Sequence, residues 1–442
     1  MKNKARIRPP AVAVVGGGAA GLAAAIEAAR AFQRADMPCG VTVLERLPRV
    51  GKKLLATGNG RCNLTNRFAS PADYFEAADF VRPALARFPA ADTLAFFASM
   101  GLLCEEEEEG RIYPMSRQAA GVLDALRLEA ERLGVRFCCE TQVRSIQRQT
   151  ERSGGTGFLI NDTLPVDAVV LASGGQASPQ HGSDGSGYAL LRALRIPVTQ
   201  VHPSLAPLLT DSRLIKPLKG LRVHAAISLY AGENCLAAQR GEIQFTETGL
   251  SGIAAMQLSR LVSREKGRRL EASLDLLPGF SRQWAEEYLR ARIRQNPALS
   301  AADLLTGILP KRVGQVLLKQ AAAGPLTRPI GALSGDEIGS IAALLKGWRF
   351  PLTGTRGFSA AQVTLGGAQR AAFDPQTLEA HRAPGFYAAG EVLDVDAGCG
   401  GFNLQWAWSS GRLAGRSAAE KQISNFRCQI SDRTKERGMG VV

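Results

Sequence analysis

The sequence predicts an α/β fold in which a domain of parallel strands and helices is interrupted by a β-rich insertion and a helical insertion. Residues 11–21 read AVAVVGGGAAG, so a buried strand breaks into glycines and an alanine-rich helix follows. Residues 386–411 repeat a strand–glycine–helix pattern far along the chain. Residues between about 195 and 350 instead show short alternating strands and then helical patterns. The two outer segments therefore predict one discontinuous Rossmann-like domain.

The first glycine-rich turn has the spacing of a dinucleotide-binding site. Gly16, Gly18 and Gly21 follow the pattern G-x-G-x-x-G between a strand and a helix. The first glycine makes the tight turn, the second lets the backbone approach a pyrophosphate, and the third lets the helix pack on the strand. Ala20 lies in the same turn, at a helix N-terminus whose free N–H groups favour an anion.

The next predicted strand, residues 41–44, ends in an acid. Glu45 is placed there to accept hydrogen bonds from a ribose. Arg46 follows it, and two interpretations stay open: the guanidinium stacks near an adenine, or it is simply solvated.

The second glycine-rich unit decides between two cofactors. A nicotinamide dinucleotide explains the first motif alone, whereas FAD also needs a distant strand end for its ribityl half and second phosphate. Residues 386–389 form that predicted strand, and acids, the run GCGGFN and a helix-like stretch through Gly411 follow. The sequence therefore favours FAD. Candidate cofactor-binding residues in this unit are Gly390, Glu391, Gly400, Gly401, Asn403 and Gln405.

A third predicted strand, within VVLASGG at 169–175, ends in small residues of the kind that cross beneath a flavin. Its candidates are Ala172, Ser173, Gly174 and Gly175, of which Ser173 reads as a packing residue.

The middle of the chain predicts a small antiparallel sheet or barrel and then helices. Residues 222–230 alternate as a strand, and residues 281–295, 301–309, 311–323 and 334–347 read as helices. The expected boundaries are 1–195 for the first part of the FAD-binding domain, 196–265 for the barrel-like insertion, 266–347 for the helical domain, 348–366 for the return through the β insertion, and 367–442 for the second part of the FAD-binding domain.

Composition places the chain among ordinary globular proteins. It has 442 residues, 45% hydrophobic and 21% charged, and no apolar run long enough to span a bilayer. Eight scattered cysteines without C-x-x-C or zinc spacing predict reduced thiols, no metal site and a cytoplasmic location. The net charge of +14 is dispersed, which favours a basic surface that attracts anionic cofactors over a dedicated nucleic-acid module.

Several blocks together resemble one family. They are VVGGGAAGL, GKKLLATGNGRCNLTN at 51–66, RIYPMSRQA, VVLASGGQASP, HPSLAPL, TGLSG, AQVTLGGA and FYAAGEVLDVDAGCGGFNLQWAWSSGRLAG at 386–415. In this order they are similar to the bacterial BaiN-like, aminoacetone-oxidase-type NAD(P)/FAD-dependent oxidoreductases. The resemblance implies non-covalent FAD, a discontinuous FAD domain, and inserted barrel-like and helical domains. It does not imply a particular substrate.

The resemblance also assigns further cofactor residues. The segment beside the pyrophosphate and flavin ring comprises Lys53, Thr57, Gly58, Asn59, Gly60, Arg61, Cys62 and Asn63, and the backbone of Val143 meets the adenine. Arg61 either neutralises a phosphate, orients an anionic substrate, or forms a structural ion pair. Relatives commonly carry a histidine and a proline where this chain has Glu247 and Ile253, so a catalytic role there is in doubt.

No catalytic group is evident, and the weak candidates are Cys62, Arg61 and Cys399. Buried hydrophobic packing is the commoner role of such cysteines, and a thiol–flavin relay is the alternative. We expect an FAD-dependent oxidoreductase that moves hydride between a small organic substrate and flavin N5. Its other redox partner is NAD(P)H, as a transient co-substrate, or O2. No membrane partner and no specific nucleic acid are expected, although a flavoprotein that modifies tRNA through its basic surface is the alternative.

Overall fold

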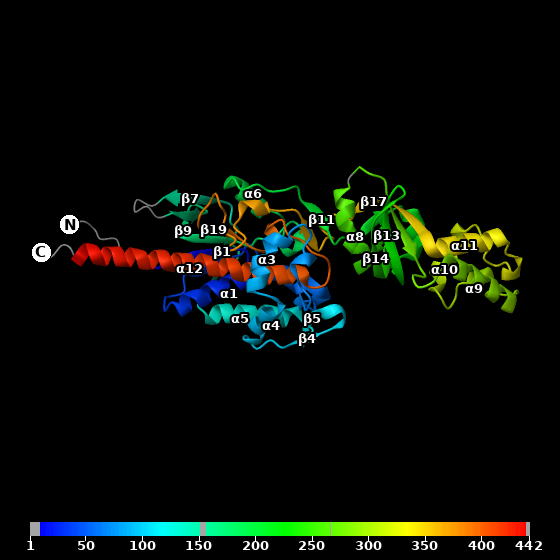
Figure 1. Ribbon diagram of the computed structural model, residues 1–442, viewed down its shortest axis with the longest axis horizontal. Coiled ribbons are helices and arrows are strands. Elements are labelled where there is room, and N and C mark those ends of the chain that lie inside the picture. The colour runs from blue at the N-terminus through cyan, green and yellow to red at the C-terminus, as the bar shows by residue number, and fades with distance from the viewer. Residues whose placement is uncertain (1–8, 151–155, 266, 439–442) are drawn as a thin grey trace. The chain divides into compact units, whose positions relative to one another are not determined.

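The computed structural model describes residues 9–150, 156–265 and 267–438. The chain divides into two compact units, one of residues 1–201 with 363–442 and one of residues 202–362. Each unit has its own cluster of buried hydrophobic side chains. Figure 1 labels many of the elements of both units.

The first unit is built on a parallel sheet with the strand order β19-β10-β1-β2-β6. Its strands are β1 (Val12–Val15), β2 (Val41–Leu44), β6 (Arg136–Cys138), β10 (Ala168–Leu171) and β19 (Phe386–Ala388). Every residue of β1, β2 and β10 is buried, which explains their uninterrupted apolar sequences. Because carboxyl ends of parallel strands share one edge, the glycine-rich turns after β1, β10 and β19 meet there.

Seven helices of the described chain belong to this unit. They are α1 (Ala19–Arg34), α2 (Lys52–Ala56), α3 (Ala78–Arg87), α4 (Ala90–Ala98), α5 (Ala119–Arg132), α6 (Gly187–Ala193) and α12 (Phe402–Gly438). The last is 37 residues long and is the red helix of Figure 1, so it contains the helix-like stretch through Gly411 and continues well beyond it.

Glycines do not end α12 because α1 packs directly on them. A Cβ on Gly411 would lie 2.3 Å from the carbonyl oxygen of Ala20, and one on Gly415 would lie 2.1 Å from that of Ala24. The two helix backbones therefore approach as closely as the missing side chains allow.

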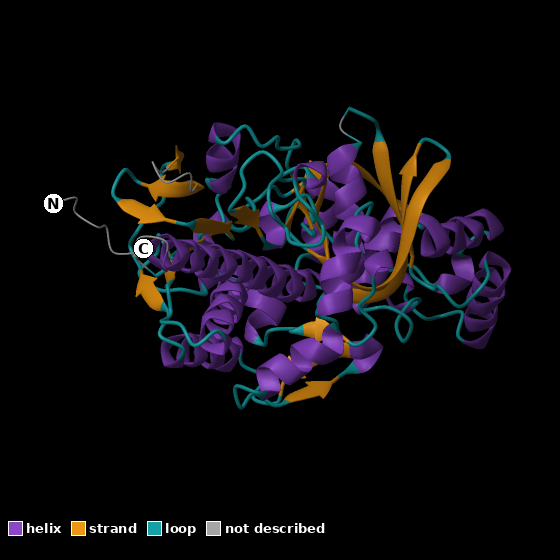
Figure 2. Cartoon of the chain, turned by 60° about the vertical axis from the view of Figure 1, so that its left-hand side comes forward, coloured by secondary structure: helices purple, strands orange, loops and turns teal. Residues whose placement is uncertain are grey.

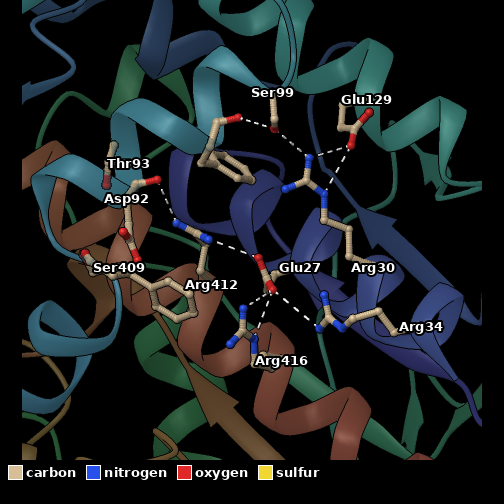
Figure 3. Close-up of polar contacts among 12 residues, drawn as sticks. Glu27, Arg30, Arg34, Asp92, Thr93, Ser99, Glu129, Ser409, Arg412 and Arg416 are labelled. Carbon is tan, nitrogen blue, oxygen red and sulfur yellow. Dashed lines mark hydrogen bonds and ion pairs between the residues drawn. The ribbon is translucent and has the colours of Figure 1, made fainter.

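A buried ion-pair cluster joins the same two helices (Figure 3). Glu27 of α1 is only 2% exposed and accepts hydrogen bonds from Arg412 and Arg416 of α12, with Nε–Oε distances of 3.3 and 3.0 Å. Arg34 lies 3.7 Å from the same carboxylate. The hydrogen bonds and charges satisfy a carboxylate that burial alone would destabilise.

Two small antiparallel sheets complete the unit, with strand orders β3-β5-β4 and β7-β8-β9. Their strands are β3 (Thr65–Asn66), β4 (Cys104–Glu106), β5 (Arg111–Pro114), β7 (Ile146–Thr150), β8 (Thr156–Ile160) and β9 (Leu164–Val166), and β18 (Val363–Leu365) begins the return segment. The acidic run at 105–109 lies in the β4–β5 hairpin.

The second unit contains a closed six-stranded barrel, β12-β15-β14-β13-β16-β17, whose long strands are orange in Figure 2. The strands are β12 (Leu208–Thr210), β13 (Arg222–Ala231), β14 (Asn234–Phe245), β15 (Gly249–Ser251), β16 (Leu270–Asp275) and β17 (Trp348–Thr355), with the short β11 (His202–Ser204) before them. The helices are α7 (Ser212–Ile215), α8 (Ile253–Arg264), α9 (Arg282–Gln295), α10 (Lys311–Gln320) and α11 (Gly335–Gly347).

One expected helix of this unit is wrong. Residues 301–309 form only a 3-10 turn, Ala301–Asp303, because Gly307 adopts a left-handed φ of +99° and Pro310 follows. The start of α11 agrees with the sequence, since Ser334 and Glu337 form a reciprocal capping box.

Among the described residues, no helix combines the length and the apolar character needed to cross a membrane.

Candidate functional site

The three glycines after β1 each have a distinct environment. Gly16 has a φ of +104°, and a Cβ there would lie 2.5 Å from the carbonyl oxygen of Ala172. A Cβ on Gly21 would lie 1.9 Å from the carbonyl oxygen of Gly16, so the helix packs against the turn. A Cβ on Gly18 would meet nothing within 4 Å. Gly18 is also the N-cap of α1 and offers no side chain to cap it, so the helix end is open to an anion.

The acid at the end of β2 lies beside this turn. Glu45 accepts hydrogen bonds from the backbone N–H groups of Gly17, at 2.8 Å, and Leu47, at 2.9 Å. A pocket of about 550 Å³ adjoins it, lined by polar residues that include Arg46, Thr141 and Arg144. Strand β6 ends at Cys138, so Val143 lies in the loop that follows it, between the pocket residues Gln142 and Arg144.

Of the two arrangements left open by the sequence, the structure contradicts a simply solvated Arg46. Its guanidinium pairs with Asp184 at 2.5 Å. Burial raises the pKa of Asp184, but hydrogen bonds from Ser186 and Arg46 outweigh burial and lower it below its usual range. The pair ties the 178–184 loop to the end of β2.

The glycine-rich turn that follows β19 contacts the glycine-rich turn that follows β1. A Cβ on Gly390, which has a φ of +74°, would lie 2.7 Å from the Cβ of Ala20. Gly401 packs equally closely, since its Cβ would lie 2.5 Å from the carbonyl carbon of Thr65. Two segments separated by more than 350 residues therefore meet at the N-terminus of α1.

Glu391 is the centre of a polar network that links three segments of the site. It accepts a hydrogen bond from Lys53 at 2.6 Å, and its other oxygen accepts from the N–H and hydroxyl of Thr364. The hydroxyl oxygen of Thr364 accepts in turn from the N–H groups of Gln176 and Ala177. Thr364 was missed as a site residue, although it stands inside the quoted block AQVTLGGA.

The loop at 57–63 has unusual backbone geometry. Gly58, Asn59 and Cys62 have φ values of +56°, +55° and +59°. The Asn63 Oδ1 atom is buried and has no hydrogen-bond partner among the described residues. It lies 3.0 Å from where a Cβ on Gly401 would be. A bound group with a polar edge would satisfy this amide.

The three catalytic candidates do not form a reactive centre. Burial raises the pKa of the fully buried Cys62 thiol to about 12. Burial also raises the pKa of Cys399 to about 11, against the opposing effect of Arg111. Both thiols are therefore neutral near pH 7, and neither is activated as a nucleophile. Arg61 lies 4.5 Å above the ring of Tyr113 and 3.5 Å from Glu107.

Gln405 is a correction to the predicted cofactor set. It is fully buried, and its amide nitrogen lies 3.0 Å from both Phe88 O and Thr93 Oγ1. Its oxygen accepts from Thr65 at 2.5 Å. All these atoms are used inside the core, so none remains to donate to a flavin.

Asn403 likewise braces its own loop, with hydrogen bonds to the N–H and carbonyl of Ala397 and to the carbonyl of Gly398. In the second unit, Glu247 pairs with Lys219 at 2.6 Å on the exposed surface.

The remaining candidates of the third strand lie at the carboxyl end of β10. Gly174 adopts a φ of +73°, and a Cβ on Gly175 would lie 2.3 Å from the Thr364 hydroxyl. Ser173 is a packing residue, because a Cβ on Gly187 would lie 2.0 Å from its Oγ. Among the residues described, no cluster of His, Cys, Asp and Glu could hold a metal ion.

Comparisons with known proteins agree with this architecture. The family model described as HI0933-like protein Rossmann domain matches residues 10–417. The chain is 37% identical over 416 residues to the 3-dehydro-bile acid delta(4,6)-reductase of Clostridium scindens, covering 93% of this chain and 99% of the relative. It is 30% identical over 398 residues to the ribosomal RNA dihydrouridine synthase of Escherichia coli, covering 90% and 95% respectively.

A solved 3-ketosteroid delta1-dehydrogenase from Sterolibacterium denitrificans aligns with 93% of this chain and 99% of its own, at 14% identity and a TM-score of 0.48. The family model and the relatives confirm the resemblance drawn from the motifs. The chain belongs to the HI0933-like Rossmann-domain family and is a flavoprotein oxidoreductase.

Proposed function

We propose that the flavin is FAD, held with its adenosine half against β1, α1 and β2 and its flavin half toward the 57–63 loop and Gly390. The observation that carries this proposal is the contact between the Gly390 turn and Ala20 at the α1 N-terminus. A flavin mononucleotide has no pyrophosphate to bind at the first turn. A nicotinamide dinucleotide would be bound by the first turn alone, so it does not explain the second turn.

Each part of the site has a role toward that cofactor. The open face at Gly18 and the first turn of α1 would hold the pyrophosphate, and Glu45 would accept ribose hydroxyls. The unpartnered amide of Asn63 would hydrogen-bond a polar edge of the cofactor. The Lys53–Glu391–Thr364 network would keep the surrounding loops in place.

Bound FAD supplies a hydride acceptor and donor at N5 of its ring. The chain itself would position the ring, and the neutral buried Cys62 offers no competing thiolate.

We further propose that the reaction is reduction of a carbon–carbon double bond conjugated to a carbonyl. The names of two relatives support it, because a 3-dehydro-bile acid delta(4,6)-reductase and a dihydrouridine synthase both describe such reductions. The substrate alkene gains a hydride and a proton, and NAD(P)H, oxidised to NAD(P)+, restores the reduced cofactor. With O2 as electron acceptor the reaction would instead run as oxidation: the saturated substrate would lose a hydride and a proton to become the alkene, and O2 would be reduced to hydrogen peroxide.

The test is a spectrum of the purified protein, followed by anaerobic addition of NADH or NADPH. We expect the spectrum of a bound flavin, which is released as FAD when the protein is denatured. One of the two nicotinamide nucleotides should reduce this flavin and bleach its absorbance. A 3-oxo-Δ4 steroid-type enone should then reoxidise it. A colourless protein that takes up no FAD would disprove the cofactor proposal. If neither NADH nor NADPH bleaches the flavin, the NAD(P)H-dependent reductase is excluded and an O2-dependent oxidase remains.

The second candidate function is reduction of uridine in ribosomal RNA. The net charge of +14 and the name of the Escherichia coli relative favour it. Reduced holoprotein incubated with an unmodified ribosomal RNA transcript would add two hydrogen atoms to specific uridines, detectable by mass spectrometry of nucleosides. If the protein reduces the enone but leaves the RNA unchanged, the second candidate function is excluded and the small-molecule reductase remains.

A further inference from the structure

A second pocket, of about 590 Å³, lies in the first unit apart from the residues of the flavin site. Arg192, Arg195, His381 and Arg382 line it, and among the described residues that line it none is acidic. The remaining lining is apolar or amide. A concave surface with several cations and no acid concentrates positive potential.

The three arginines are exposed, and none takes part in an ion pair within the described ranges. A fourth guanidinium lies next to them, because Arg148 donates a hydrogen bond to the carbonyl of Arg382 at 3.1 Å. The repulsion among cations gathered without an acid would be relieved by a bound anion.

The backbone holds two of these arginines together at some cost. Helix α6 ends in a Schellman motif, with hydrogen bonds from Arg195 N to Arg192 O and from Ile196 N to Leu191 O. Arg195 has a φ of +58° at the position where glycine is usual. An arginine at a position that favours glycine points to a use for its side chain.

The pocket lies away from the cofactor. The first residue of α6, Gly187, packs on Ser173 at the carboxyl end of β10, whereas Arg192 and Arg195 lie at the other end of this seven-residue helix, about 10 Å along it. His381 and Arg382 precede β19, whose opposite end carries Gly390. None of the residues that line the pocket is one of the candidate cofactor residues.

We propose that this pocket binds phosphate groups. The planar guanidinium fork matches phosphate oxygens, and three such forks around one hollow suit two or more phosphates. The proposal does not depend on the reaction proposed above. The phosphates belong either to the backbone of an RNA strand or to a nucleotide such as NADPH, and the experiment distinguishes these sources.

The experiment uses the full-length holoprotein and two probes, a fluorescein-labelled single-stranded RNA of twelve nucleotides and NADPH. The pocket variant is R192Q/R195G/R382Q, and the matched control is R87Q/R290Q/R312Q, which removes the same charge from exposed arginines outside the pocket. If RNA is the ligand, the pocket variant weakens binding on the order of tenfold or more. The slope of log K against log salt then becomes shallower by about 2, since each single-strand phosphate contact contributes about 0.7.

A loss of NADPH affinity in the pocket variant, with RNA binding unchanged, assigns the phosphates to the nucleotide. Equal binding of both probes by the pocket and control variants overturns the proposal. The single variant R195G separates loss of binding from loss of folding. Glycine adopts the left-handed backbone conformation of residue 195 without strain, so the melting temperature of this variant should not fall. Its affinity for the phosphate ligand should nevertheless fall. Flavin content should be unchanged in all these variants.

Discussion

At the residue scale, the site depends on which glycines face protein and which face open space. Gly18 is the only one of the three motif glycines whose added Cβ would meet no atom within 4 Å. Gly21, one turn later, would collide with the Gly16 carbonyl. The same substitution at these two positions therefore separates cofactor binding from folding.

We predict that Gly18→Ala lowers flavin affinity by roughly tenfold or more, about 1.4 kcal/mol, with little change in the stability of the apoprotein. The new methyl group would lie where the pyrophosphate approaches. Gly21→Ala should destabilise the apoprotein itself by about 1–3 kcal/mol or more, because the helix must move off the turn. Flavin titration and thermal melts of the apoproteins measure the two effects. Equal loss of stability in both variants would contradict this division.

The buried thiol of Cys62 gives a pH dependence of stability. Its pKa is raised by burial from 9.0 to about 12 in the folded chain. Between these values the unfolded state releases a proton that the folded state keeps, so stability is unaffected below about pH 9 and falls as the pH rises to about 12. The limiting slope is about 1.4 kcal/mol per pH unit for one thiol. Urea denaturation between pH 8 and 11 should show this loss, and Cys62→Ala should show less of it. Iodoacetamide should fail to label Cys62 in the folded protein at pH 8.

At the scale of elements, the contact between α1 and α12 joins the two ends of the first unit. It combines glycine-to-backbone packing with the ion pairs of Glu27, Arg412 and Arg416 (Figure 3). Burial raises the pKa of Glu27, but hydrogen bonds and charge from Arg416 and Arg412 outweigh burial and lower it from 4.5.

We predict that Glu27→Ala destabilises the protein by about 3–5 kcal/mol, because it leaves the partly buried guanidinium of Arg412 without its carboxylate. Glu27→Ala/Arg412→Leu should recover part of the loss, since it also removes the uncompensated charge. The ion-pair contribution is fully present above about pH 4.5 and is lost as the pH falls through the lower pKa of the folded state. Denaturant melts of the three proteins at pH 7 and pH 4 measure both effects. A double variant less stable than the single variant would contradict the argument.

The elements that the sequence predicted correctly are those specified by neighbouring residues. Strands β1, β2 and β19 and the Ser334 capping box all follow from short patterns. The errors involve distant partners. Gln405 looks like a flavin ligand until Phe88 and Thr93, more than 300 residues away, are found to hold it. Helix α12 continues past Gly411 because α1 packs against its glycines, and no local sequence pattern predicts that contact.

At the scale of the whole molecule, the chain contains two hydrophobic cores that share no residue. One is built from buried residues within 12–196 and 368–423, and the other from buried residues within 208–350. All the candidate cofactor residues belong to the first unit. Unfolding of the second core therefore need not release the flavin.

This separation predicts two transitions in calorimetry of the full chain, of which only one responds to FAD. Ligand at 100 times its Kd stabilises the state that binds it by about 2.7 kcal/mol, so the transition of the first unit should move to higher temperature with added FAD. The transition of the barrel and helices should stay in place, because all the candidate cofactor residues belong to the first unit. A variant defective in FAD binding, Gly18→Ala, should show both transitions and lose the shift. A single transition that moves as a whole would mean that the two cores unfold as one cooperative unit, despite their separate packing.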